Sequence, residues 1–197
     1  IPNHKNYGYG MSLDVCGLLI KEHTAIGDIV YDPFMGRGTT LLEGAFLGRR
    51  VVGNDVNPLS KILLFPRLNP SKMDEIEYRL NTIPLDKNIL AGIDLSMFYH
   101  SDTAGELVSL KNYLLYQKMN GSEDVIDGWI RMVATNRLTG HSSGFFSVYT
   151  LPPNQAVSSA SQIKINKRKN QKPEYRDIKK LILKKTKSLL RNISSVN

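Results

Sequence analysis

One stretch of the chain, residues 28–58, constrains the fold more than any other. It predicts a strand at 29–31, a glycine turn at 36–38, a short helix, and a second strand at 51–54. The β-branched and aromatic run Ile29-Val30-Tyr31 has the composition of a buried strand. Two strands joined through a helix predict a β-α-β unit, whose strands run parallel and end at the same edge of a sheet.

The turn and the end of the second strand hold the residues that suit ligand binding. Gly36 and Gly38 let the backbone turn sharply and approach a ligand without a Cβ in the way. Gly38 or Thr39 is expected to cap the following helix, and Gly48 suits its C-terminal end. Asp55 directly follows the second strand. Glycines and a helix N-terminus beside one strand, with a carboxylate beside the next, predict a nucleotide-type site.

The glycine pattern alone excludes two common nucleotide motifs. Leu41 stands where the third glycine of a dinucleotide fingerprint would be, and the chain has no Gly-Lys-Ser/Thr of a P-loop. A lone Gly-x-Gly is equally compatible with a purely structural strand–turn–helix. The glycines by themselves therefore do not identify the ligand.

The complete string is more specific. Asp-Pro-Phe-Met-Gly-Arg-Gly-Thr-Thr at 32–40, followed by Gly-Asn-Asp-Val-Asn-Pro at 53–58, resembles the first two motifs of the S-adenosylmethionine-dependent DNA amino-methyltransferases. The family pattern is Asp-Pro-Phe-x-Gly-Ser-Gly-Thr-Thr and then Gly-x-Asp-x-Asn-Pro. Arg37 is the departure, because Ser or Cys is usual there. A side chain at this point can face solvent, so the change disturbs cofactor binding only slightly.

The resemblance implies S-adenosylmethionine as the cofactor, held by the glycine loop, with Asp55 on the ribose hydroxyls. Tyr9 or Ser12 is a further candidate for the methionine end, the alternative being an ordered arm that leads into a helix. Asn57-Pro58 is expected to shape the adenine pocket or, equally, to be a structural turn. The expected cofactor-binding residues are Asp32, Pro33, Phe34, Gly36, Gly38, Thr39, Thr40, Asp55 and Asn57.

The implied fold class is α/β, a Rossmann-like methyltransferase fold that is incomplete in this sequence. Residues 1–70 are expected to form its cofactor-binding start, 71–160 a mainly helical insertion suited to target recognition or to covering a sheet, and 161–197 a basic helical tail. Pro66 is expected to break the helix that follows Pro58. Further helix predictions are a start near Ser71, a capping box at Thr103–Glu106, core positions at Trp129 and Met132, and a tail helix with Pro173 in its first turn.

Residues 139–154 form the least regular stretch. Phe145, Phe146 and Tyr149 suit either stacking on nucleobases or, as the favoured interpretation, a loop held to the core. The family's catalytic motif is Asp/Asn/Ser-Pro-Pro followed by an aromatic residue. Leu151-Pro152-Pro153-Asn154 lacks both the polar acceptor and the aromatic, so it is rejected and no catalytic residue is assigned.

Two strands are too few for a complete fold of this class. We therefore expect a half-built sheet with an open edge and an uncovered apolar face, stabilised by self-association or by a C-terminal half of the same enzyme. In the implied order of motifs, the catalytic one follows the tail. The chain alone is then expected to be inactive.

Charge is concentrated at one end of the chain. The net charge is +8, and residues 161–197 contain twelve lysines and arginines against only Glu174 and Asp177. The remaining residues have fourteen basic and sixteen acidic side chains. A solvated helix surface is one explanation, but this density favours contact with phosphates, and DNA is the partner that the resemblance implies.

Several classes are excluded by composition. The single cysteine, Cys16, rules out disulfides within one chain and fits a cytoplasmic location, while His100 and His141 are too isolated for a metal site. No apolar run approaches the ~20 residues of a membrane span. The functional prediction is a DNA methyltransferase acting on adenine or cytosine amino groups, as in restriction–modification. The alternatives are a transfer-RNA methyltransferase and a non-catalytic cofactor- or DNA-binding subunit.

Overall fold

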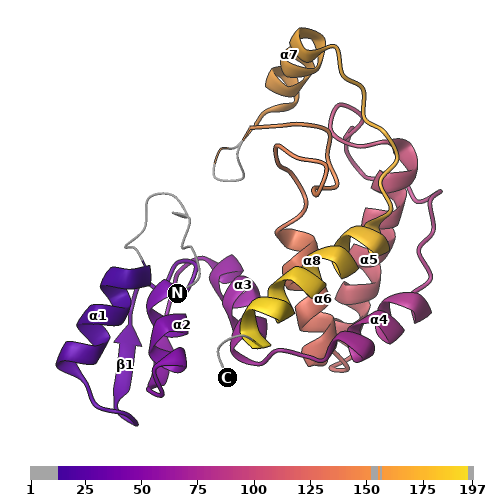
Figure 1. The fold of residues 1–197 in the computed structure, drawn as a ribbon. Coiled ribbons are helices and arrows are strands. Elements are labelled where there is room, and N and C mark those ends of the chain that lie inside the picture. Colours follow the sequence, from indigo (N-terminus) through magenta and orange to yellow (C-terminus); the bar gives the residue numbers. More distant parts are fainter. Residues whose placement is uncertain (1–12, 152–154, 156, 195–197) are drawn as a thin grey trace. The chain divides into compact units, whose positions relative to one another are not determined.

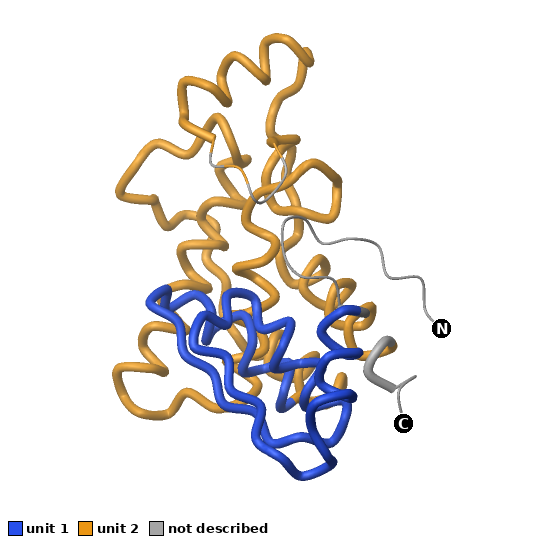
Figure 2. Tube along the Cα trace, turned by 90° about the vertical axis from the view of Figure 1, so that its left-hand side faces the viewer, with its two compact units in different colours: residues 1–69 blue, residues 70–197 orange. Residues whose placement is uncertain are grey.

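A computed structural model describes residues 13–151, 155 and 157–194. The order of its helices and strands is shown in Figure 1. The elements are α1 (Leu13–His23), β1 (Ile29–Asp32), α2 (Thr39–Phe46), β2 (Arg50–Gly53), α3 (Pro58–Leu68), α4 (Met73–Thr82), α5 (Ser101–Met119), α6 (Val125–Thr135), α7 (Ser159–Lys169) and α8 (Ile178–Ser194). The chain divides into two units, residues 1–69 and 70–197, which are coloured separately in Figure 2.

The first unit is built on a parallel pair of strands. β1 and β2 pair in register from Ile29 opposite Arg50 to Asp32 opposite Gly53. α2 packs on one face of this pair, where Val30 is buried, and α1 packs beside α2. α2 approaches the strands so closely that a Cβ on Gly44 would lie 2.9 Å from Val51 Cγ1. The predicted α/β class is confirmed, while the Rossmann-like arrangement stays a prediction because the described residues form only two strands.

Within the described residues of the first unit, the other face of the strand pair is apolar and exposed. Ile29, Tyr31 and Val52 are 57%, 58% and 50% exposed. Successive side chains of a strand point to opposite faces, so these three share the face opposite α2. An exposed apolar face agrees with the sequence-based expectation, while the half-built character of the sheet stays a prediction.

α3 corrects one prediction. Pro66 was expected to break this helix, yet α3 continues through it to Leu68. Pro66 lies in the last turn, where its missing N–H removes a single helical hydrogen bond. Asn69 N donates to Phe65 O at 3.3 Å and closes the helix beyond the proline.

The second unit is helical, and α8 is part of its core. α8 packs against α4, α5 and α6, with Ile178 and Ile182 fully buried. Trp129 of α6 donates from Nε1 to Thr186 Oγ1 of α8 at 3.1 Å. The predicted core positions Trp129 and Met132 are both fully buried, and residues 161–197 belong to this unit.

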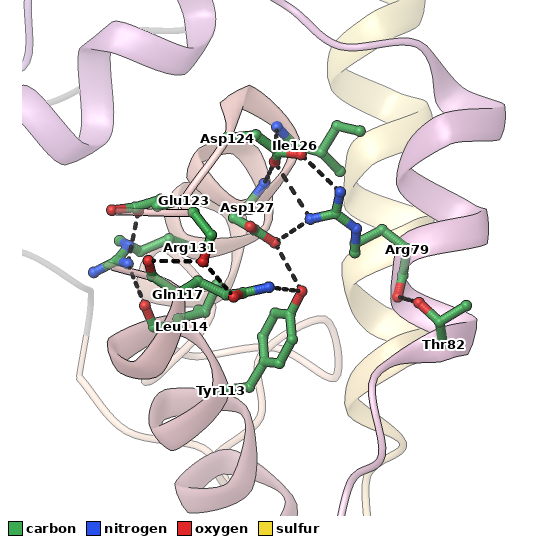
Figure 3. Close-up of polar contacts among 11 residues, drawn as sticks. Arg79, Thr82, Tyr113, Leu114, Gln117, Glu123, Asp124, Ile126, Asp127 and Arg131 are labelled. Carbon is green, nitrogen blue, oxygen red and sulfur yellow. Dashed lines mark hydrogen bonds and ion pairs between the residues drawn. The ribbon is translucent and has the colours of Figure 1, made fainter. Parts of the chain in front are cut away.

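A polar network joins three helices of this unit (Figure 3). Arg79 of α4 binds Asp124 and Asp127 with N–O distances of 2.7 Å each. Asp127 is fully buried and also accepts from Tyr113 Oη of α5 at 3.3 Å. Asp124 caps α6 by accepting from the backbone N–H groups of residues 126 and 127. The network therefore fixes α4, α5 and the start of α6 to one another.

Two predicted helix starts in this unit are wrong. α5 begins at Ser101 with His100 as its N-cap, so Thr103 and Glu106 do not form a capping box. Their side chains instead bind the 175–176 segment, from which Arg176 N donates to Thr103 Oγ1 at 2.9 Å. α8 begins at Ile178 rather than near Pro173. These starts depend on contacts between distant segments, which local patterns do not contain.

The described part of the irregular stretch before α7, residues 139–151, contains turns, bends and one isolated bridge between Gly140 and Tyr149. Phe145 and Phe146 are 6% and 1% exposed, which favours a loop held to the core over base stacking by these rings. Ser158 caps α7 through a bond from Ser161 N at 3.2 Å. None of the described helices is long and apolar enough to span a bilayer. Groups of three or more metal-binding side chains are likewise absent from the described residues.

Candidate cofactor site

The glycine loop is tied to the carboxyl ends of both strands. β1 ends at Asp32, whose Oδ1 accepts from Phe34 N at 3.0 Å. Met35 N then donates to Asn54 O at 3.0 Å, just beyond β2. Gly36 and Gly38 have φ angles of +51° and +80°. Side chains rarely tolerate this left-handed region, so both positions favour glycine on backbone grounds.

Gly38 is also required by packing. A Cβ there would overlap the side chain of Leu64 from α3. Gly38 is the N-cap of α2 and offers no side-chain acceptor to the first turn of this helix. The N-terminal N–H groups and the positive end of the helix dipole favour an acceptor or an anionic group at this point. The loop therefore packs closely against Leu64 and ends at the free N–H groups that begin α2.

Asp55 lies at the centre of the site. Its Oδ2 accepts from Gly36 N at 2.7 Å and its Oδ1 accepts from Asn57 N at 2.8 Å. These backbone donors, Asn57 first and then Gly36, lower the pKa of Asp55 below its ordinary value, assisted by the Ser60 hydroxyl. The carboxylate is therefore ionised at neutral pH. Its two oxygens offer about four acceptor positions, so it can bind a ligand hydroxyl while holding the loop.

Of the other predicted residues, some have structural contacts and others are exposed at the loop. Asn57 caps α3, with Oδ1 accepting from Leu59 N at 3.0 Å, so its side chain has a structural role. Thr40 bonds to the thiol of Cys16, whose pKa burial raises. Phe34 is 85% exposed at the loop, and Arg37, which departs from the family pattern, is also exposed. Pro33 is exposed and Thr39 half-buried.

The structure brings Asp32, Phe34, Gly36, Asp55 and Asn57 together through the bonds described above. Tyr9 and Ser12, the candidates for the methionine end, lie outside the described residues. Sequence reasoning missed three contributors to this arrangement: Leu64, Met35 and Asn54. Leu64 is one of several apolar residues in α3, and the other two act through backbone atoms, so no motif marks them.

Comparison with known proteins gives the same segment a family. Residues 3–61 match the model of the N6 and N4 DNA methylase family. Among curated relatives, the Type II methyltransferase M.MvaI of Kocuria varians is 38% identical over 63 residues, which are 28% of this chain and 14% of the relative. M.MjaII of Methanocaldococcus jannaschii is 33% identical over 58 residues, 29% of this chain and 11% of the relative.

A third relative extends the match slightly. The Type II methyltransferase M.BsoBI of Geobacillus stearothermophilus is 38% identical over 68 residues, covering 34% of this chain and 13% of the relative. This chain thus spans well under a fifth of the length of these three relatives. No solved structure matches it. The resemblance to DNA amino-methyltransferases is confirmed for the N-terminal segment, which contains the site described above except for Leu64.

Proposed function

We propose that this chain is part of an S-adenosylmethionine-dependent DNA methyltransferase acting on an adenine or cytosine amino group. The observation that carries the proposal is the bond from Gly36 N to Asp55 Oδ2, which joins the two family motifs at the ends of adjacent parallel strands. The names of the similar proteins, all Type II methyltransferases, support the reaction class and a role in DNA methylation.

The residues present fit a nucleoside cofactor. Gly36 is exposed and has no side chain, so a ligand can approach the backbone of the loop there. The ionised Asp55 keeps acceptor positions free for ribose hydroxyls. Phe34 has an exposed ring, which would suit packing against the adenine. When bound, S-adenosylmethionine supplies the electrophilic methyl group of a sulfonium.

This sequence provides residues for binding the cofactor but none for the methyl-transfer step itself. Methyl transfer to an amino nitrogen needs groups that accept hydrogen bonds from the amino group and a group that holds the flipped base. The Leu151–Asn154 segment offers neither a carboxylate, amide or hydroxyl before Pro152 nor an aromatic after Pro153. This favours one alternative, a cofactor-binding subunit that is completed by another polypeptide or segment. Incubation of residues 1–197 with labelled cofactor and mixed-sequence duplex DNA tests this conclusion. No methylated base is expected, and methylation by residues 1–197 alone would show that catalytic residues have been overlooked.

Calorimetric titration tests the cofactor proposal directly. Asp55→Ala should weaken binding of S-adenosylmethionine or its demethylated product by about 1.5–3 kcal/mol, the contribution of a charged hydrogen bond. This equals about ten- to hundred-fold in affinity. Asp28→Ala is the matched control, because Asp28 is an exposed carboxylate at the opposite end of β1 that also accepts one backbone bond, from Ala25 N at 2.8 Å.

The outcomes of this titration are separable. Wild type and Asp28→Ala should bind equally, and Asp55→Ala should bind more weakly. Equal affinities for all three proteins would remove Asp55 from the site. A folded wild type that binds neither ligand would overturn the assignment of the cofactor itself.

A further inference from the structure

The outer face of α8 carries a regular row of cations. Lys180, Lys184, Lys187 and Arg191 follow one another at spacings of four, three and four residues, which places them on one side of a helix. All four side chains are exposed. We refer to these four residues as the α8 stripe. The buried side of the same helix, at Ile178, Ile182 and Thr186, faces the opposite way.

Ion pairing within α8 does not account for the α8 stripe. Residues 178–194 contain no carboxylate, so the helix has no ion pairs of its own. Like charges three or four positions apart destabilise a helix by about 0.2–0.5 kcal/mol per pair. Among the described parts of the chain, no carboxylate lies within ion-pair distance of these four side chains. A surface helix under selection for stability alone would alternate acids and bases.

α8 nevertheless holds the α8 stripe in a fixed position. Trp129 Nε1 donates to Thr186 Oγ1 in the buried core. Lys179 Nζ donates to Ile83 O at 2.7 Å and so ties the helix to the end of α4. At the start of α8, Asp177 Oδ1 accepts from Lys180 N at 2.9 Å. The charges are therefore presented from a rigid element.

A partner of the α8 stripe must be a polyanion that binds to the exposed, charged face of α8. A basic amphipathic helix can also lie on an anionic membrane, but only if its apolar face is free to enter the bilayer. The apolar face of α8 is occupied by the core of its own unit, with Ile178 and Ile182 at 0% exposure. Only the charged face is available.

We propose that the α8 stripe binds the phosphate backbone of duplex DNA and thereby positions the duplex without reading its sequence. The helical rise of 1.5 Å per residue gives the stripe a length of about 16 Å. One DNA strand presents a phosphate every ~3.4 Å of duplex axis, so four cations meet as many phosphates over that length. The inference rests on the proposed function for the choice of DNA over other polyanions.

The test is the salt dependence of DNA binding by the full chain. Fluorescence anisotropy with a labelled 20-base-pair mixed-sequence duplex measures affinity at several salt concentrations. Lys184→Gln/Lys187→Gln should flatten the logarithmic salt slope by about 1.8, since each lost phosphate contact lowers it by about 0.9. Taking 1 M salt as reference, this corresponds to about sixty-fold weaker binding at 0.1 M salt. Neutralising all four residues should flatten the slope by about 3.6.

Lys111→Gln/Lys118→Gln is the matched control, because it removes two exposed lysines from α5 of the same unit. It should leave the salt slope unchanged. Equal losses in both double variants would mean a general effect of net charge and would overturn the proposal. So would an unchanged slope in the α8 variants, or tighter binding to duplex RNA or to phosphatidylserine vesicles than to duplex DNA.

Folding and cofactor binding are checked separately. The α8 variants should melt at the temperature of wild type or slightly above it, because the side chains are exposed and their mutual repulsion is removed. They should also bind S-adenosylmethionine with unchanged affinity. If the wild type binds DNA through the α8 stripe but binds no cofactor, the proposed function fails and this inference stands.

Discussion

The network around Arg79 allows a quantitative test of what holds the helical unit together. Asp127 is fully buried, 2.7 Å from Arg79 Nη1, and its second oxygen has no partner among the described residues. Replacing Arg79 by methionine keeps most of the apolar volume of the side chain but removes the charge. Asp127 is then left buried with the Tyr113 hydroxyl, at 3.3 Å, as its remaining partner (Figure 3).

The cost follows from burial rather than from the number of ion pairs. Leaving one member of a buried pair uncompensated destabilises a protein by about 3–5 kcal/mol. The bond from Arg79 to Asp124 adds little, because Asp124 is 41% exposed and exposed pairs contribute about 0–1 kcal/mol. We therefore expect Arg79→Met to lower the free energy of unfolding by about 3–5 kcal/mol.

Thermal and urea unfolding followed by circular dichroism measure this change. Glu123→Gln is the control, because it breaks the partly exposed Arg131–Glu123 pair and should cost at most about 1 kcal/mol. Asp127→Asn introduced together with Arg79→Met removes the stranded charge and should recover most of the loss. The reasoning is refuted if Arg79→Met costs no more than Glu123→Gln, or if the double variant is no more stable than Arg79→Met.

Two further outcomes are expected. Gly38→Ala should destabilise the first unit and abolish cofactor binding in calorimetry, because the new Cβ overlaps Leu64 at a φ of +80°. Gly27→Ala is the control, because Gly27 has a φ of +90° but open space around it. It should cost only the backbone strain of about 1–2 kcal/mol and leave cofactor affinity unchanged. Burial raises the pKa of Tyr99 to about 12. The protonated phenol is therefore favoured by folding, and its contribution is complete below pH ~10 and falls by about 1.4 kcal/mol per pH unit between pH ~10 and ~12. Tyr99→Phe should remove this alkaline loss in urea titrations, at a cost of about 0.5–1.5 kcal/mol near neutral pH for the bond to Leu138 O.

The conformation of the glycine loop was predictable because the residues that determine it are close together in the sequence. Gly36 and Gly38 are required by backbone angles that few other residues adopt, and Asp55 follows a short β-branched strand. A sequence with glycines after one strand and a carboxylate after the next places the loop and the carboxylate at the same edge of the sheet. The role of Asp55 in binding Gly36 N was not predictable, because the bond joins residues nineteen positions apart and depends on the pairing of β1 with β2.

Helix boundaries in the second unit show where local patterns fail. Thr103 and Glu106 have the spacing of a capping box, but the helix starts two residues earlier, at Ser101. The Thr103 hydroxyl serves Arg176 N, and Glu106 accepts from Tyr175 Oη at 2.9 Å. Both partners are about seventy residues away. A pattern of propensities cannot distinguish a cap from a side chain that a distant segment requires.

In the first unit, the bonds that shape the candidate cofactor site are separate from the exposed apolar face. The bonds that shape the site run among Asp32, the glycine loop, Asn54 and Asp55, all at the carboxyl ends of β1 and β2. Ile29 lies at the other end of its strand and faces away from α2, and no bond of the site passes through it. Covering the exposed face should therefore stabilise the unit as a whole, whereas we expect affinity for the proposed cofactor to depend on Asp55 and on the packing of Gly38 against α3.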